Sequence, residues 1–233
     1  MSDHAAEHEV LAAVLAVRDG ALSTLLWQRA MPPDAGRWAV PGGRIRPTED
    51  VEESVVRQLA EKVDVREITH VEQIAVFSRP DRVPGPRRIA TAFLGLVPSD
   101  ADPAVPSDTA WHPLADLPPT AFDHATIVED ARERLRAKLS YTNLGFALAP
   151  REFTISALRD LYVAALGHPV SATNLQRVLT RRAVLEPTGA MAPPGPAGGR
   201  PAALFRFAER ALRVTDAFAV LRPPGESSRP AVP

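Results

Sequence analysis

Two patterns of apolar and polar positions divide this chain of 233 residues into parts. Short apolar runs bounded by Gly, Pro and Asp predict strands, and apolar positions that recur four apart predict helices. We expect strands over residues 9–18, 21–28, 38–40, 70–77 and 88–97, and helices over 51–63 and 123–139. Strands flanked by two long helices predict an α/β sandwich, a mixed sheet between helices, over residues 8–140.

A different pattern follows a linker predicted over residues 141–150. Helices are expected over 154–166 and 171–182, because Gly167 ends the first and Ser171 can cap the second. Strands over 183–188 and 202–207 would flank a loop rich in Gly and Pro. Helix, turn, helix and a two-stranded wing predict a winged helix-turn-helix domain over 151–222. The proline-rich residues 223–233 are predicted to be a disordered tail.

Charge is divided unevenly between these two parts. The formal net charge is only −1. Residues 1–150 carry 16 Lys and Arg against 22 Asp and Glu, whereas residues 151–222 carry 10 Arg against 5 acidic residues. An acidic part followed by a basic part favours a second module that faces a polyanion such as nucleic acid.

The composition excludes several classes of protein. The chain has no cysteine, which excludes disulfides and thiolate metal sites. It has no apolar run of about 18 residues, the length that a membrane helix needs. Its acidic N-terminus lacks the basic and apolar regions of a signal peptide. We therefore expect a cytoplasmic protein with no membrane contact.

The stretch from Gly43 to Val65 carries the candidate chemistry. It resembles the Nudix box, G-x5-E-x7-R-E-U-x-E-E-x-G-U, where U is aliphatic. The matching positions, at the correct spacing, are Gly43, Glu49, Arg57, Leu59, Glu61 and Val65. Three positions depart from the motif: Gln58 and Lys62 replace glutamates, and Asp64 replaces a glycine. Aspartate adopts the left-handed conformation more readily than most residues, so Asp64 is tolerable.

The two lost glutamates leave a poor site for two metal ions, although Glu61 and Glu49 could still hold one metal weakly. Residues 57, 58, 61 and 62 share one helix face, which in the working motif presents glutamates to divalent cations. Gln58 offers only a neutral oxygen, and the ammonium of Lys62 repels a cation. We therefore expect no catalytic residue and no metal site. The resemblance also implies that Arg57 supports the fold by pairing with a loop acid such as Glu49.

The pocket can persist without the reaction. Arginine offers a planar fork that suits phosphate oxygens. The candidate ligand-binding residues are Arg44, Arg46, Glu49, Arg57, Glu61, Lys62, Arg82, Arg87 and Arg88. The competing interpretation is that the loop arginines are simply solvated.

The helix over 171–182 is the candidate DNA reader. Leu175, Val178 and Leu179 form a narrow apolar stripe, so they should face the core. The outward residue types suit phosphates and base edges in the major groove. The candidate DNA contacts are Thr173, Asn174, Gln176, Arg177, Thr180, Arg181 and Arg182 of the helix, with Arg200 and Arg206 of the wing. A merely solvated helix face is the alternative.

The resemblance extends over roughly residues 8–210. Several further stretches look like the Nudix-related transcriptional regulators of NAD metabolism. They are residues 122–125, which open one helix, residues 153–154, which open the next, the helix around Asn174, and the wing residues 188–189 and 199–202. That resemblance implies a homodimeric repressor of NAD biosynthesis or salvage genes that binds double-stranded operator DNA. It implies ADP-ribose or a related nucleotide as effector, no required cofactor, and a hinge around residues 140–151.

Two other functions stay open at this point. The chain could be an ADP-ribose pyrophosphatase-like Nudix hydrolase with relocated metal ligands. Four acids keep this possible: Glu49, Glu52, Glu53 and Glu61. Glu52 and Glu53 are more simply explained as a solvated first turn that suits the helix dipole. A protein-interaction adaptor is the third possibility, and it would show no specific DNA binding.

Overall fold

In the computed structural model, residues 6–193 and 201–216 are described. The first part is one seven-stranded sheet with the order β3-β2-β1-β6-β5, in which β4 also pairs with β1 and β7 with β2. The strands are β1 (Glu7–Arg18), β2 (Ala21–Gln28), β3 (Trp38–Ala39), β4 (Gly42–Arg44), β5 (His70–Phe77), β6 (Arg88–Leu96) and β7 (Thr109–Pro113). Because β1 and β6 are parallel and the other pairs are antiparallel, the sheet is mixed, as predicted.

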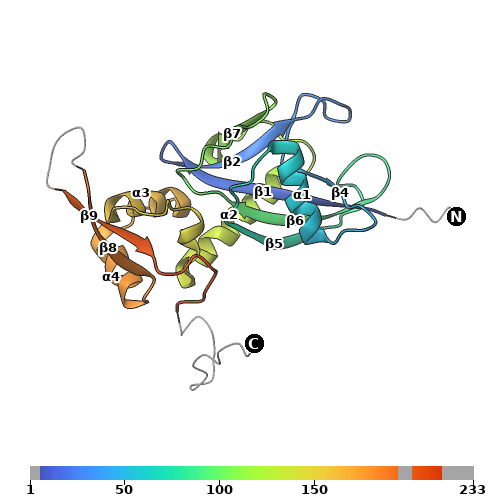
Figure 1. Cartoon of the computed structure of the whole chain (residues 1–233). Coiled ribbons are helices and arrows are strands. Elements are labelled where there is room, and N and C mark those ends of the chain that lie inside the picture. Colours follow the sequence, from blue (N-terminus) through green and yellow to red (C-terminus); the bar gives the residue numbers. More distant parts are fainter. Residues whose placement is uncertain (1–5, 194–200, 217–233) are drawn as a thin grey trace, which may run out of the picture.

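Two helices cover opposite faces of this sheet (Figure 1). Successive side chains of a strand point to opposite faces. On β1, Val10 and Val14 pack in one core cluster with Leu59 of α1 (Val51–Val63). Leu11 and Leu15 pack in the other cluster, which holds the inner residues of α2 (His124–Tyr141). The α/β sandwich predicted from the sequence is therefore confirmed.

Both ends of α1 are fixed by local contacts. Asp50 accepts hydrogen bonds from the backbone N–H groups of Glu52 and Glu53, and the Glu53 carboxylate accepts from the N–H of Asp50. This capping box stabilises the first turn. Asp64 ends the helix with φ 48° and ψ 31°, the left-handed conformation expected from its place in the motif.

Two short strands were missed by the sequence patterns. β4 is only Gly42, Gly43 and Arg44, and two glycines give no apolar signal. β7 (Thr109–Pro113) mixes polar and apolar residues, and it forms by pairing with β2. Neither strand can therefore be predicted from its own residues, because each forms by pairing with a neighbouring strand.

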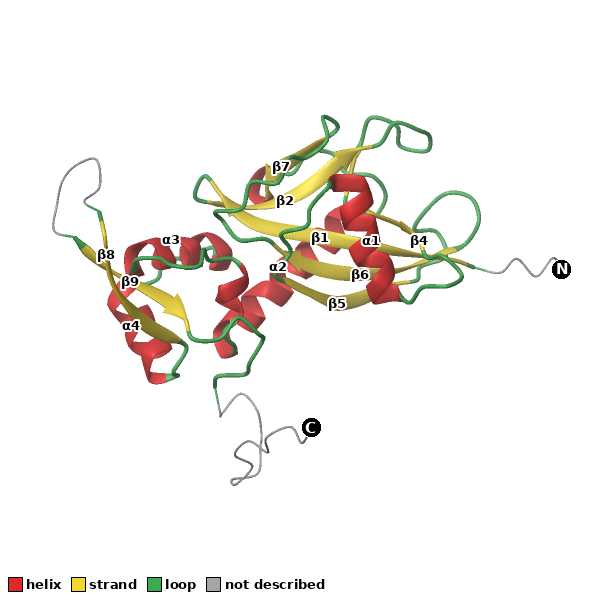
Figure 2. Cartoon of the chain, in the orientation of Figure 1, coloured by secondary structure: helices red, strands yellow, loops and turns green. Residues whose placement is uncertain are grey.

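The second part has the predicted winged helix outline (Figure 2). Its helices are α3 (Ile155–Leu166) and α4 (Ala172–Arg181), and the antiparallel wing is β8 (Leu185–Ala192) with β9 (Ala202–Phe207). Gly167 ends α3 in the left-handed conformation, and the Ser171 hydroxyl accepts the N–H of Asn174 to cap α4. β8 reaches four residues beyond the expected strand end.

The segment predicted as a linker is packed rather than exposed. Residues 142–149 are buried, and Leu144–Ala147 forms a 3-10 helix. The Asn143 amide donates to the carbonyls of Glu209 and Ala211, and its oxygen accepts the N–H of Arg213. One core cluster runs from β1 through α2 and this segment into α3 and α4. The two parts therefore share a hydrophobic core.

Some sequence predictions lie outside the described residues. These are the disordered tail over 223–233 and the contact assigned to Arg200. Within the residues that the structure describes, no helix combines the length and the apolar character needed to cross a membrane.

Candidate functional site

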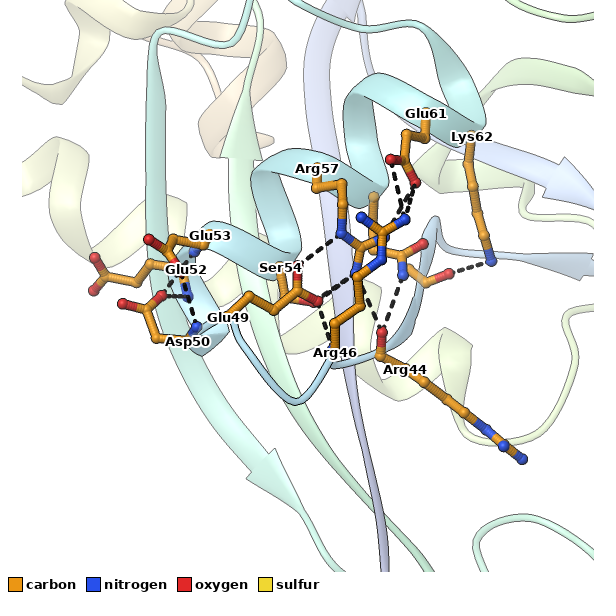
Figure 3. A network of polar contacts seen from close by, with 12 residues as sticks. Arg44, Arg46, Glu49, Asp50, Glu52, Glu53, Ser54, Arg57, Glu61 and Lys62 are labelled. Atoms are coloured by element: carbon orange, nitrogen blue, oxygen red, sulfur yellow. Dashed lines mark hydrogen bonds and ion pairs between the residues drawn. The ribbon is translucent and has the colours of Figure 1, made fainter.

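Arg57 of α1 is the centre of a polar network along the motif (Figure 3). Its Nε donates to Glu49 Oε2 at 2.7 Å, and a second donor binds the other oxygen of Glu49. It also donates to the carbonyl of Arg44 at 3.3 Å. The Arg57 bonds hold the pKa of Glu49 at about 2. Arg57 thus fixes the loop that precedes α1, as the resemblance implied.

Glu61, the remaining acid of the motif, is also paired. Its carboxylate lies 3.1 Å from Arg57 and 3.4 Å from Arg46. Arg46 further uses its backbone N–H to bind the Glu49 carboxylate at 2.7 Å. Among the described residues, no group of three or more His, Cys, Asp or Glu side chains is placed to hold a metal ion. The acids of this face are balanced by arginines.

Gln58 and Lys62 both present hydrogen-bond donors to the backbone of the motif. Gln58 is buried, and its Nε2 donates to the carbonyl of Arg44 at 3.3 Å. Lys62 Nζ donates to the carbonyl of Gly42 (Figure 3). It also lies 5.2 Å from the ring centroid of Trp27. A carboxylate at either position could not make these bonds, because it has no donor when ionised.

A half-open cavity of about 240 Å³ lies beside Lys62. It is formed where β1, β2, β4 and the first residues of β6 and α2 meet. Its lining is Glu9, Leu11, Trp27, Arg29, Val40, Gly42, Gly43, Arg44, Lys62, Arg88, Phe122 and His124. Three of the predicted ligand-binding residues line it: Arg44, Lys62 and Arg88.

The charged groups of this cavity are mostly cationic. Four cationic side chains line it, against the single carboxylate of Glu9. Glu7, next to the cavity, accepts from Arg44 at 2.7 Å and from Arg88 at 2.9 Å. The cavity therefore suits an anion, with Trp27 and Phe122 as flat apolar surfaces.

The first residues of α2 form one wall of the cavity. His124 is buried, and its Nδ1 accepts the N–H of Val40 at 3.1 Å. Burial lowers the pKa of His124 to about 4, so the ring is neutral near pH 7. Arg29 lies 4.8 Å from the ring centroid of Phe122, a cation–π contact.

The other predicted ligand residues lie away from this cavity. Arg46, Glu49, Arg57 and Glu61 form the network described above, and none of them lines it. Arg87 donates to the carbonyl of Ser78 at 3.2 Å and is exposed.

Arg82 is buried and does not line this cavity. Its side chain is 1% exposed and donates to Asp123 and to Glu9. Its donors are thus directed at two carboxylates of this chain.

Sequence reasoning missed most of the cavity's apolar and aromatic lining. Trp27 and Arg29 stand at the end of a hairpin strand and beyond it, where no motif marks them. Phe122 and His124 contributed to the whole-chain resemblance without a predicted role in the pocket. The sequence does show polar and aromatic residues at the start of a long helix. Only the fold, however, places the start of that helix beside the Nudix motif.

Most of the candidate DNA-contact residues of α4 lie on its exposed face. Leu175 and Leu179 are buried and Val178 is partly buried, so the apolar stripe faces the core. The exposed candidates are Thr173, Asn174, Arg177, Thr180 and Arg181, and Gln176 is half-buried. Arg177 donates to Asn174 Oδ1 at 2.7 Å, which orders both side chains on the surface.

Two further candidates for DNA contact have partners within the chain. Arg182 donates to the carbonyl of Ser140 at 2.9 Å and to Asp216 at 2.6 Å, which ties α4 to the end of α2. Arg206 of β9 pairs with Glu186 of β8 at 2.6 Å and remains exposed. Arg206 is thus accessible on the wing, whereas Arg182 has a supporting role.

Comparison with known proteins identifies both parts. Residues 8–131 match the family model of the NUDIX domain, and residues 145–207 match that of the NrtR DNA-binding winged helix domain. Over 206 residues the chain is 31% identical to the ADPR responsive transcriptional repressor NtrR of Acinetobacter baylyi, which covers 84% of this chain and 80% of the relative.

Solved structures agree with this assignment. Shewanella oneidensis NrtR complexed with a 27mer DNA aligns with TM-score 0.75 and 33% identity, over 85% of this chain and 92% of that one. The NUDIX domain of the same NrtR, complexed with ADP ribose, aligns with TM-score 0.51 and 35% identity, over 56% of this chain and 89% of that one. This chain therefore belongs to the NrtR-like family of Nudix-related transcriptional regulators.

Proposed function

We propose that this protein is a transcriptional repressor that binds operator DNA through its winged helix domain and responds to ADP-ribose in its Nudix domain. The observation that carries this proposal is a cationic cavity at one end of α2 and a DNA-reading module packed on the other end. The ADP-ribose complex of the related NUDIX domain and the DNA complex of the related full chain support it.

The diphosphate of ADP-ribose fits the charge of the cavity. Arg44 and Arg88 each bind Glu7 through one nitrogen and offer their remaining guanidinium donors, and Lys62 offers a point charge. The cavity volume of about 240 Å³ is smaller than the roughly 300–1,000 Å³ of a typical ligand site. The ligand would therefore place its charged part in the cavity and extend past it. Trp27 and Phe122 are candidates to stack on a ring or ribose.

α2 provides the mechanical link between ligand and DNA. His124 at its first turn lines the cavity, and Tyr141 at its last turn accepts the N–H groups of Thr215 and Asp216. An 18-residue helix is about 27 Å long and moves as a rod. Because residues 142–149 are buried, a small displacement at the cavity would be passed on through packed contacts rather than lost in a loose linker.

Repression would then depend on the spacing of two reading helices. We infer that the protein acts as a homodimer, with α4 of each protomer reading half of a two-fold operator upstream of NAD biosynthesis or salvage genes. ADP-ribose would lower DNA affinity by favouring a different orientation of the two winged helices. A ligand can shift this equilibrium only by its difference in affinity for the two states.

We also infer that the protein does not hydrolyse its ligand. The motif lacks two of its acids, and Glu49 and Glu61 are paired with arginines. Glu53 serves in the capping box of α1, which supports the structural interpretation of the first-turn acids. Hydrolysis by relocated metal ligands would require these pairs to open.

A gel shift at fixed salt tests the proposal. The full chain should retard DNA from upstream of the host's NAD biosynthesis genes, and ADP-ribose should reverse the shift, with AMP and ribose 5-phosphate as matched controls. The salt must be constant because affinity for DNA depends steeply on it. Retardation that ADP-ribose does not change would discard this effector. Equal affinity for unrelated DNA would discard operator recognition, and ADP-ribose turnover with Mg²⁺ would restore the hydrolase alternative.

A further inference from the structure

We propose that the Lys62 ammonium is the built-in counter-cation of the Nudix cavity, so that a diphosphate ligand binds there without a divalent metal. This inference rests on the proposed function, because it concerns the effector site of that function. It goes further in stating that metal ions are dispensable for sensing and in naming the residue that replaces them.

The first observation behind this proposal is the position of Lys62. It projects from α1, and its Nζ donates to the carbonyl of Gly42 (Figure 3). Lys62 lines the cavity, and its Nζ lies 5.2 Å from the ring centroid of Trp27. The residue as a whole is exposed, whereas this hydrogen bond is partly buried. An ammonium has three N–H donors. Gly42 takes one of them, and within the described part of the chain no further hydrogen bond or salt bridge holds the others.

The second observation is that the acids around the cavity are already paired. A divalent cation needs anionic oxygen ligands. Around the cavity, each carboxylate already has a cationic partner: Glu9 binds Arg82, and Glu7 binds both Arg44 and Arg88. Glu49 and Glu61 of the motif are paired with arginines in the same way. A metal ion would have to displace arginines from these carboxylates and lie close to Lys62.

The third observation concerns Gln58. Its buried amide donates to the carbonyl of Arg44 and does not line the cavity, so position 58 presents no carboxylate to a cation there. The ammonium of Lys62 suits phosphate oxygens directly, whereas acids would suit them only through a bridging cation. Of positions 58 and 62, one has thus lost its anionic oxygens and the other presents a cation to the cavity.

Calorimetric titration of the full chain with ADP-ribose, in EDTA and in Mg²⁺, is the first test. We expect equal affinity in the two buffers, within about twofold. An affinity at least about tenfold higher in Mg²⁺, a difference of about 1.4 kcal/mol, would overturn the inference and leave the proposed function standing. No binding in either buffer would overturn both.

Variants at Lys62 give the second test. Lys62→Met keeps the apolar stem and should weaken ADP-ribose at least about tenfold in EDTA, the loss of one charge-assisted contact. Lys62→Glu should lose binding in EDTA and regain part of it in Mg²⁺. Arg66→Met, which removes an exposed cation that does not line the cavity, should bind as the unaltered protein does.

Each variant must first show the melting temperature and DNA retardation of a folded protein. If the Lys62→Met protein is unfolded, Lys62→Arg takes its place, because it keeps the charge and should keep metal-independent binding. Unchanged affinity in a folded Lys62→Met protein would overturn the inference. So would loss of affinity in Lys62→Arg that Mg²⁺ restores.

Discussion

Arg82 and Asp123 are joined by two parallel hydrogen bonds, from Nε to Oδ2 and from the terminal nitrogen to Oδ1, each 2.8 Å long. Arg82 also donates to Glu9 at 2.7 Å. One guanidinium thus ties the loop before β6 to the start of α2 and to β1. Because Phe122 and His124 flank Asp123, this pair positions one wall of the cavity without entering it.

Arg82→Met should destabilise the protein by about 3–5 kcal/mol, because it leaves two partly buried carboxylates unpaired. Denaturant unfolding followed by circular dichroism measures this change. Arg79→Met, in the same loop but exposed, should change stability by less than about 0.5 kcal/mol. An Arg82→Met protein that unfolds normally yet loses ADP-ribose affinity would make Arg82 a ligand residue after all.

Arg57 and Glu49 should show strong coupling in a double-mutant cycle. Arg57→Ala and Glu49→Ala should each lower the free energy of unfolding, and the double variant should lower it by clearly less than the sum of the two. The lowered pKa of Glu49, about 2, means that the pair stabilises fully above pH 4.5 and loses its effect as pH falls toward 2. Additive losses at pH 7 would contradict the pairing.

His124 should make stability depend on pH between 6.5 and 4. The unfolded state takes up a proton on this ring near pH 6.5, whereas the buried ring does so only near pH 4. The contribution of the neutral His124 ring to the free energy of unfolding is therefore complete above pH 6.5. It is lost as pH falls to 4, and the total loss is about 3 kcal/mol. His124→Asn keeps an acceptor for Val40 and should flatten the slope, measured by denaturant midpoints at each pH. If the dependence of stability on pH is unchanged in this variant, a group other than His124 titrates in this pH range.

Lys62 should titrate below the usual lysine pKa of 10.5, because partial burial disfavours its charged form. The chain has two lysines, Lys62 and Lys138, so ¹³C-labelled lysine gives two side-chain resonances that Lys62→Arg assigns. Bound ADP-ribose should raise the pKa of Lys62, and its affinity should fall as pH rises through the pKa of the free protein. A Lys62 resonance that ADP-ribose leaves unmoved would contradict a contact with the ligand.

Arg177 and Arg182 should separate DNA recognition from folding. Arg177→Ala should weaken operator binding by about 1–3 kcal/mol at fixed salt and leave stability unchanged, because the side chain lies on the exposed face of α4. Arg182→Ala should lower stability, since it loses its bonds to Ser140 and Asp216. Fluorescence anisotropy and thermal melting measure the two effects. Normal operator affinity in Arg177→Ala would move recognition to another surface.

Much of the fold followed from local rules. The apolar runs of the longer strands and the left-handed residue Asp64 depend on neighbours in the sequence, so each could be predicted. The same holds for the apolar stripe of α4, which fixes the face that remains for DNA. Local rules failed at β4 and β7, because a three-residue strand with two glycines and a strand of mixed polarity form only against their partners.

The sequence by itself determined that the motif's acidic face was lost, because Gln58 and Lys62 stand one helical turn apart whatever the rest of the fold does. Only the tertiary structure decided which cations reach the cavity. Arg82 and Asp123 are 41 residues apart, and Glu7 and Arg88 are 81 apart, so their pairing depends on the parallel register of β1 and β6 and on the docking of α2. Charge identifies candidate arginines, and long-range packing decides whether a carboxylate of the chain or a ligand will face them.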